Sequence, residues 1–197
     1  MRLFLAVFPP PAAQSLAHDA AAALKRAAAA EGMGEKTVSW VRLENLHYTL
    51  RFIGEVGEDG ARRIAGAAEE AAASRPHFDV TLGGLGAFPR ARDARVLWVG
   101  LAAGADPFRD LARGLEKALE KRGFDREKRG FSPHLTLGRL HEPGLDWTNA
   151  LAGMNSLENN PASGFTVRSI SVVVSHLSPK GSHYDIRAEA ALAAAHP

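Results

Sequence analysis

The sequence predicts an α+β fold of two pseudo-symmetric lobes, each with an antiparallel-rich sheet and outer helices. Two observations lead to this expectation. Strands and helices follow one another in the first half of the chain, and the second half repeats their order. The middle strand of each half carries the same four-residue pattern, His-x-Thr-Leu. With 197 residues and no long polar linker, we expect residues 1–197 to form a single bilobal domain.

Short apolar runs and helix-forming stretches follow one another through the first half. Proline after the first run ends a strand, the alanine-rich stretch favours a helix, and β-branched or alternating runs favour strands. The expected elements are strands over 2–8, 36–42, 46–53 and 78–85, and helices over 12–30 and 61–74.

The second half begins after a basic segment, 86–95, which we expect to be a loop or hairpin tip. Apolar residues three to four positions apart predict an amphipathic helix over 107–122, and the turn at 179–181 predicts a closing hairpin. The other expected elements are strands over 96–101, 131–140, 165–177 and 184–188, and a helix over 147–157.

Composition excludes several classes of protein. Hydrophobic residues make up 46% and charged residues 23%, which excludes a disordered or fibrous chain. The first apolar run ends in prolines rather than in a cleavage pattern, and no run reaches the roughly 18 residues of a membrane span. We therefore expect a cytoplasmic protein with no membrane partner. The absence of cysteine excludes disulfides, thiolate metal sites and cysteine nucleophiles.

The charge balance favours a local binding site for an anion over a broad one. Lysine and arginine number 24 against 22 acidic residues, a net charge of +2. So small an excess predicts no extended phosphate-binding surface. Eight histidines make imidazole the most prominent candidate for chemistry.

The two His-x-Thr-Leu patterns are His47 to Leu50 and His134 to Leu137. On a strand, alternate side chains share a face, so His47 and Thr49 point the same way, as do His134 and Thr136. The residues between them face the opposite side, where helices can cover them. A cleft between the lobes would then hold two imidazoles and two hydroxyl groups.

Two imidazoles and two hydroxyls suit displacement at phosphorus. One neutral imidazole accepts the proton of an attacking water, and the other, protonated, donates to the leaving oxygen. The hydroxyls donate to the nonbridging oxygens, and no metal is needed. One such motif alone is typical of an ordinary strand histidine, but two at equivalent places are harder to explain that way. A zinc site at His47 and His134 lacks a third ligand at suitable spacing.

Residues 38–56 and 131–139 resemble the two motifs of the two-histidine phosphoesterase superfamily, and most closely those of the RNA 2',3'-cyclic phosphodiesterases, also named 2'-5' RNA ligases. The resemblance spans nearly the whole chain. It departs at Leu43, where proline is frequent, and at Tyr48, where the family has an aliphatic residue. Neither position faces the expected cleft.

The resemblance implies a bilobal α+β fold whose central cleft carries both motifs. It implies hydrolysis of a terminal RNA 2',3'-cyclic phosphate to a 2'-phosphate, with ATP-independent ligation as the reverse reaction. His47 would be the proton donor, His134 the proton acceptor, and Thr49 and Thr136 would hold the phosphate. The partners would be RNA ends or cyclic nucleotides, with no cofactor, no metal and no obligate protein partner.

Arginines form a second set of candidates. Alternation places Arg51 on the face of His47, near the phosphate, and points Arg139 away from the cleft toward surface carboxylates. Arg129 and its neighbour Lys128 precede the second motif and are candidate phosphate contacts. The aromatic residues Trp40, Phe131 and Tyr184 are candidates for stacking on a base, although such residues more often belong to the core.

Two other functions fit the same residues. The same chemistry could act on another cyclic phosphate or on a 2',5'-linked oligonucleotide. Alternatively, the chain could be a non-catalytic module that binds RNA ends. The module accounts for the basic loops but does not need two histidines together with two threonines.

Overall fold

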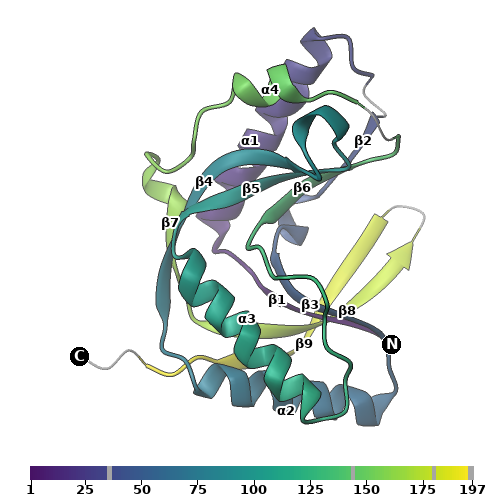
Figure 1. Cartoon of the computed structure of the whole chain (residues 1–197), viewed down its shortest axis with the longest axis vertical. Coiled ribbons are helices and arrows are strands. Elements are labelled where there is room, and N and C mark those ends of the chain that lie inside the picture. The colour runs from purple at the N-terminus through teal and green to yellow at the C-terminus, as the bar shows by residue number, and fades with distance from the viewer. Residues whose placement is uncertain (35–36, 143–144, 179–180, 195–197) are drawn as a thin grey trace.

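The structure, a computed structural model, describes residues 1–34, 37–142, 145–178 and 181–194 (Figure 1). These residues form one nine-stranded sheet and four α-helices. The strands are β1 (Arg2–Val7), β2 (Val38–Trp40), β3 (Tyr48–Glu55), β4 (Phe78–Phe88), β5 (Val96–Ala103), β6 (Leu135–Leu140), β7 (Gly164–Val167), β8 (Ser169–Ser178) and β9 (Gly181–Ala191). The helices are α1 (Pro11–Ala30), α2 (Glu58–Ala73), α3 (Ala105–Glu120) and α4 (Thr148–Ala152).

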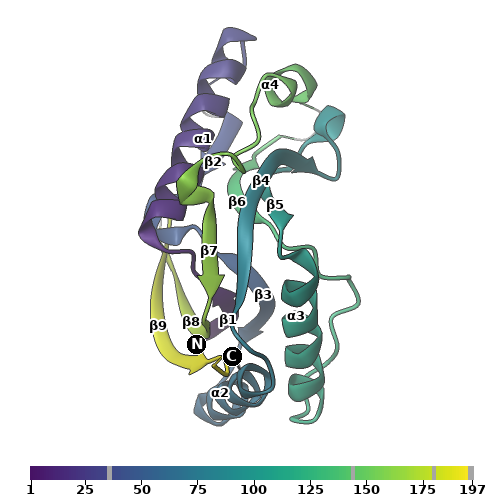
Figure 2. The same cartoon turned by 90° about the vertical axis from the view of Figure 1, so that its left-hand side faces the viewer.

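The sheet is antiparallel and strongly curled. Its strands lie in the order β7-β4-β5-β6-β3-β1-β8-β9, and β2 pairs with β6. Only Arg168 separates β7 from β8 in the chain, yet β7 is an edge strand and β8 lies beside β1 across the sheet. The sheet must therefore bend round to bring these strands near each other, as Figure 2 shows. β8 and β9 pair along their length as the closing hairpin, and residues 179–180 of its expected turn lie outside the described residues.

The lobes do not have separate sheets, contrary to the sequence prediction. One half of the sheet, β7-β4-β5-β6 with β2, continues into the other half, β3-β1-β8-β9. The two halves meet where Tyr48 of β3 pairs with Leu135 of β6. This arrangement keeps the predicted duplication of strand and helix units but joins the two lobes at the motif strands themselves.

Helices cover the two ends of the curled sheet. α1 and α4 lie together at one end, whereas α2 and α3 lie together at the other (Figure 1). The predicted apolar face of α3 is buried, and Phe108, Leu111, Leu115 and Leu119 on it are at most 1% exposed. Tyr48 is also fully buried and packs on Phe108, with ring centroids 4.9 Å apart. The covered face of the motif strand is therefore as predicted.

Several elements differ from their predicted bounds. β3 and β6 begin at Tyr48 and Leu135, so each motif histidine lies immediately before its strand. The strand over 165–177 is split at Arg168, because the chain passes there from one edge of the sheet to the far side. The helix over 147–157 is only the short α4, which ends at Ala152. The segment over 86–95 is partly strand, since β4 continues to Phe88. Among the described residues, no helix combines the length and apolarity needed to cross a bilayer.

Candidate active site

The two motif strands are antiparallel neighbours. Tyr48 lies opposite Leu135, so His47 and Thr49 flank one member of this pair and His134 and Thr136 flank the other. Leu135 and Tyr48 are fully buried on the other face of the sheet. The fold therefore brings the two motifs together, because Thr49, His134 and Thr136 line one groove and Nε2 of His47 lies 2.9 Å from the Thr49 hydroxyl.

Both imidazoles are held in the same tautomer. Nδ1 of His47 donates to the carbonyl of Asn45, and Nδ1 of His134 donates to the carbonyl of Ser132, each over 2.7 Å. A carbonyl oxygen only accepts, so the proton of each neutral ring lies on Nδ1 and Nε2 has its lone pair free. In His47 this Nε2 lies 2.9 Å from the Thr49 hydroxyl, which donates to it.

Burial makes both histidines weaker bases. It lowers the pKa of His47 to about 4, with smaller lowering by the positive charges of Arg139 and His134. The ring of His47 lies within 5.5 Å of three other rings, those of Phe4, Phe8 and Tyr184. These rings exclude water from the imidazole.

His134 lies in a less enclosed environment. Burial, and then the charge of Arg139, lowers its pKa below the usual value for histidine. One aromatic ring, that of Phe88, packs edge-on against it with centroids 5.0 Å apart. In the free protein at neutral pH, both histidines are therefore uncharged.

A groove of about 1960 Å³ runs beside the motif strands. Thr49, His134 and Thr136 line it, together with one face of α3 and residues 125–132. The groove is lined by charges of both signs.

Arg139 also lines this groove, contrary to the prediction that it points away. Thr136 pairs with Trp98 of β5, and Gly138 pairs with Leu97. Leu137 therefore has no partner of its own and is an extra residue in the ladder. A β-bulge of this kind changes which side chains share a face. It brings Arg139 to the side of Thr136. The sequence offered only Gly138 as a weak indication of a bulge.

A second bulge separates Arg51 from the face of His47. Thr49 pairs with Ala6 but Arg51 pairs with Leu5, leaving an extra residue between them on β3. Regular alternation, on which the prediction rested, is lost there. The Arg51 guanidinium instead forms ion pairs with Glu116 and Glu127.

Arg51 connects β3 with α3 and the segment after it. Its Nη1 donates to Glu127 over 3.1 Å, and its Nε lies 3.4 Å from Glu116 of α3. Nη2 donates to the backbone carbonyl of Asp125. Arg51 lines the groove, but its charge is already paired.

The other sequence candidates lie in different surroundings. Arg129 and Lys128 line the groove at the segment that leads to His134. Of the aromatic candidates, Tyr184 lies at His47, whereas Phe131 stacks on Phe108 and Trp40 packs on a buried tryptophan.

The five remaining histidines in the described part of the chain do not line the groove. Among the described residues, His141 bonds to Ser39, His77 to Arg168, and the hairpin residues His176 and His183 to Asp185. His196 lies outside the described residues. No cluster of three or more His, Asp or Glu side chains in the described part of the chain is arranged to hold a metal ion.

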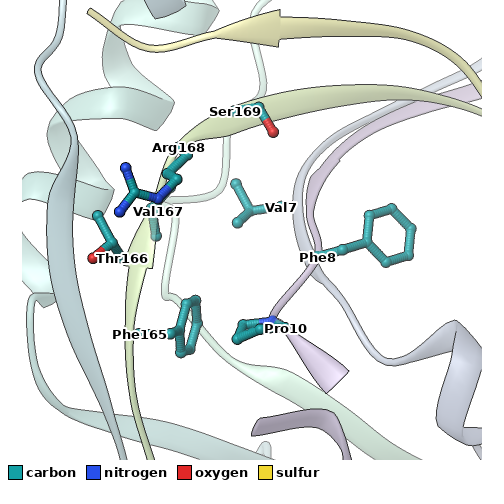
Figure 3. Close-up of a pocket in the computed structure, with 8 residues that line it drawn as sticks. All are labelled: Val7, Phe8, Pro10, Phe165, Thr166, Val167, Arg168 and Ser169. Carbon is teal, nitrogen blue, oxygen red and sulfur yellow. The ribbon is translucent and has the colours of Figure 1, made fainter. Parts of the chain in front are cut away.

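A second, smaller cavity of about 340 Å³ lies between the end of β1 and the junction of β7 with β8 (Figure 3). Val7, Pro10 and Phe165 provide apolar walls, and Arg168 is the one charged residue on its lining. In Figure 3 the Phe8 ring points away from the Val7 and Val167 side of the cavity. With no acid or base besides a guanidinium, this cavity does not offer the groove's chemistry.

Comparison with known proteins identifies the family. The family model of the 2'-5' RNA ligase superfamily matches residues 8–179. The chain belongs to the 2'-5' RNA ligase superfamily. A relative from Methanothermobacter thermautotrophicus, an RNA 2',3'-cyclic phosphodiesterase, is 37% identical over 148 residues, which cover 75% of this chain and 78% of that protein.

Solved structures share the fold. A crystal structure of TT0787 from Thermus thermophilus matches with a TM-score of 0.75 and 26% identity, covering 100% of both chains. The Escherichia coli LigT structure in complex with 3'-AMP matches with a TM-score of 0.67 and 24% identity over 97% of each chain. The chain thus shares its curled α+β architecture with these two proteins.

Proposed function

We propose that this protein hydrolyses the 2',3'-cyclic phosphate at the end of an RNA to a 2'-phosphomonoester. The observation that carries the proposal is the pairing of Tyr48 with Leu135, because it brings together two motifs whose imidazoles are anchored in the same way. The family membership and the activity of the 37% identical relative support the same reaction.

Each histidine has one proton transfer in the proposed reaction. A water molecule attacks phosphorus and passes a proton to Nε2 of His134. The bond from phosphorus to the 3' oxygen breaks, and that oxygen takes a proton from Nε2 of His47. Thr49 and Thr136 donate hydrogen bonds to the nonbridging oxygens, whose charge is stabilised in the transition state. With a 5'-hydroxyl group in place of the water, the same two proton transfers join two RNA ends.

His47 must gain a proton before it can donate one. Its pKa of about 4 leaves the free imidazole neutral at pH 7. A phosphate anion against Nε2 favours the charged imidazole, since an opposite charge nearby raises the pKa of histidine. Proton uptake by His47 therefore accompanies substrate binding in this mechanism.

The test is turnover of an oligonucleotide that ends in a 2',3'-cyclic phosphate, measured in EDTA, with the position of the product phosphate determined. We expect a 2'-phosphate product and a loss of at least about 10²-fold in rate for His47→Ala and for His134→Ala. Binding without turnover would favour the non-catalytic module. Activity that requires added zinc would contradict metal-independent acid–base catalysis, and turnover only of 2',5'-linked oligonucleotides would assign a different substrate.

A further inference from the structure

The β8–β9 hairpin contacts the segment that carries His47, although the two lie far apart in the chain. The side-chain amide of Asn45 donates a hydrogen bond of 2.9 Å to the backbone carbonyl of Ser182 in β9. Two residues further along β9, Tyr184 packs edge-on against the His47 ring, with centroids 5.4 Å apart and ring planes at 86°.

Asn45 therefore makes two different connections. Its side chain reaches the hairpin, and its backbone carbonyl accepts the Nδ1 proton of His47. On the other side of the same segment, Gln14 of α1 donates to the carbonyl of Leu46 over 3.0 Å. The peptide that sets the tautomer of His47 is thus held by side chains from outside the motif strand.

Tyr184 adds a constraint on the orientation of the imidazole. Its ring packs on Phe4 of β1 at 4.9 Å as well as on His47, and Phe4 itself lies 4.9 Å from His47. An imidazole enclosed in this way has little freedom to rotate about its side-chain bonds. Rotation would move Nε2 away from the position it holds beside Thr49.

Among the described residues, the hydrogen bond and the ring contact of His134 come from outside the hairpin. The carbonyl that holds its Nδ1 belongs to Ser132, an exposed residue of the segment just before β6. The ring packed against it, Phe88, comes from β4. A change in the hairpin should therefore affect one imidazole and leave the other as an internal control.

We propose that the β8–β9 hairpin positions His47 for proton transfer, through Asn45 and Tyr184, which are positioning residues. The hairpin keeps the Nδ1–H of His47 donating to the Asn45 carbonyl, and it keeps Nε2 of the same ring directed toward the phosphate. Its effect on turnover rests on the function proposed above. Its effect on the tautomer and orientation of His47 does not, and the two can be measured separately.

The first measurement is kinetic, with Asn45→Ala and Asn45→Asp as the principal variants. Loss of the amide donor should lower kcat by about 5- to 10-fold, the range expected for one hydrogen bond, while KM changes less than twofold. Asn149→Ala is the matched control, because Asn149 is exposed on α4. Tyr184→Phe keeps the packed ring and should retain more of kcat than Tyr184→Ala.

The second measurement is nitrogen NMR of the histidine rings in the same full-length variants. In the wild type we expect the Nδ1-protonated tautomer for both His47 and His134. In Asn45→Ala and Tyr184→Ala, the His47 nitrogens should shift toward a mixture of tautomers while those of His134 stay in place. Asn149→Ala should leave both spectra unchanged.

The proposal is overturned if the His47 nitrogens of Asn45→Ala match the wild type, or if His134 shifts as much as His47. A fall in kcat/KM that lies wholly in KM would also contradict it. If the wild-type protein fails to turn over the cyclic phosphate, the proposed function fails, but the NMR comparison still decides whether the hairpin sets the state of His47. Asn45→Asp, which preserves the shape of the side chain, serves where the alanine variant does not fold.

Discussion

The hydroxyl of Thr49, in β3, lies 2.9 Å from Nε2 of His47, which immediately precedes that strand. In the free protein it donates to the imidazole, and a bound phosphate would compete for the same proton. Replacing Thr49 with valine keeps the shape of the side chain and removes the hydroxyl. Since hydrogen bonds to charged groups contribute roughly 1.5–3 kcal/mol, we expect kcat/KM to fall by about 10- to 100-fold.

Thr136→Val should have a loss of similar size, because the register places Thr136 in the equivalent position. Thr166→Val is the control, since that hydroxyl donates to Asp79 on β4. Activity should be measured on the cyclic-phosphate oligonucleotide, with circular dichroism to check folding. Wild-type rates in both motif variants would exclude the threonines from phosphate binding.

The pH dependence of kcat/KM follows from the lowered pKa of both histidines. The reaction needs one proton on the pair, and kcat/KM refers to the free protein. The singly protonated pair is most abundant between the pKa of His47, about 4, and that of His134, which is lowered from 6.5. We therefore expect a bell-shaped profile with its maximum on the acid side of neutrality.

Above the upper pKa of the pair, kcat/KM should fall by about tenfold for each pH unit. The measurement is an initial-rate series at constant ionic strength over the range in which the protein stays folded. A profile that rises or stays level from neutral to alkaline pH would be incompatible with two histidines as acid and base.

Arg139 lowers the pKa of both histidines by its charge and lines the groove. Arg139→Gln removes that charge, so both pKa values should rise and the alkaline limb of the profile should move to higher pH. KM should increase because a cation near the phosphate is lost. Arg26→Gln, an exposed change on α1, should alter neither quantity. An unshifted profile in Arg139→Gln would place its charge outside the site.

Arg51 and Arg129 were expected to share a role in substrate binding, yet their surroundings differ. The side chain of Arg51 is 12% exposed and pairs with Glu116 and Glu127, so its loss leaves two carboxylates without their cation. We expect Arg51→Ala to lower the free energy of unfolding by about 1–2 kcal/mol, and Arg129→Ala to change it by less than about 0.5 kcal/mol.

Urea denaturation of both variants at one pH measures this difference. Arg129→Ala should instead raise KM for an oligonucleotide and weaken the dependence of KM on salt, since its charge faces the groove. Equal stability of the two variants, with a larger KM effect for Arg51→Ala, would return Arg51 to the role of a phosphate ligand.

Much of the site could be predicted because its pattern is local. The alternation of side chains on a strand needs only neighbouring residues, and it correctly placed Tyr48 and Leu135 on the covered face. The helical spacing from Phe108 to Leu119 likewise predicted the buried face of α3. The duplicated His-x-Thr pattern indicated the candidate site and the family, and the family model confirmed the latter.

The sequence by itself thus determined the two motifs, the faces of their strands and the approximate places of the main helices. Tertiary structure decided which strands those two strands pair with and in which register. Whether a residue adds to a ladder or bulges from it depends on partners far away in the chain, here Leu5 for Arg51 and Leu97 for Gly138. One extra residue in a strand moves every following side chain to the opposite face. Arg139 therefore lines the groove, and the Arg51 guanidinium pairs with Glu116 of α3. The pairing of β3 with β6 also joined the two expected sheets into one, and such long-range pairing cannot be predicted from the periodicity of a single segment.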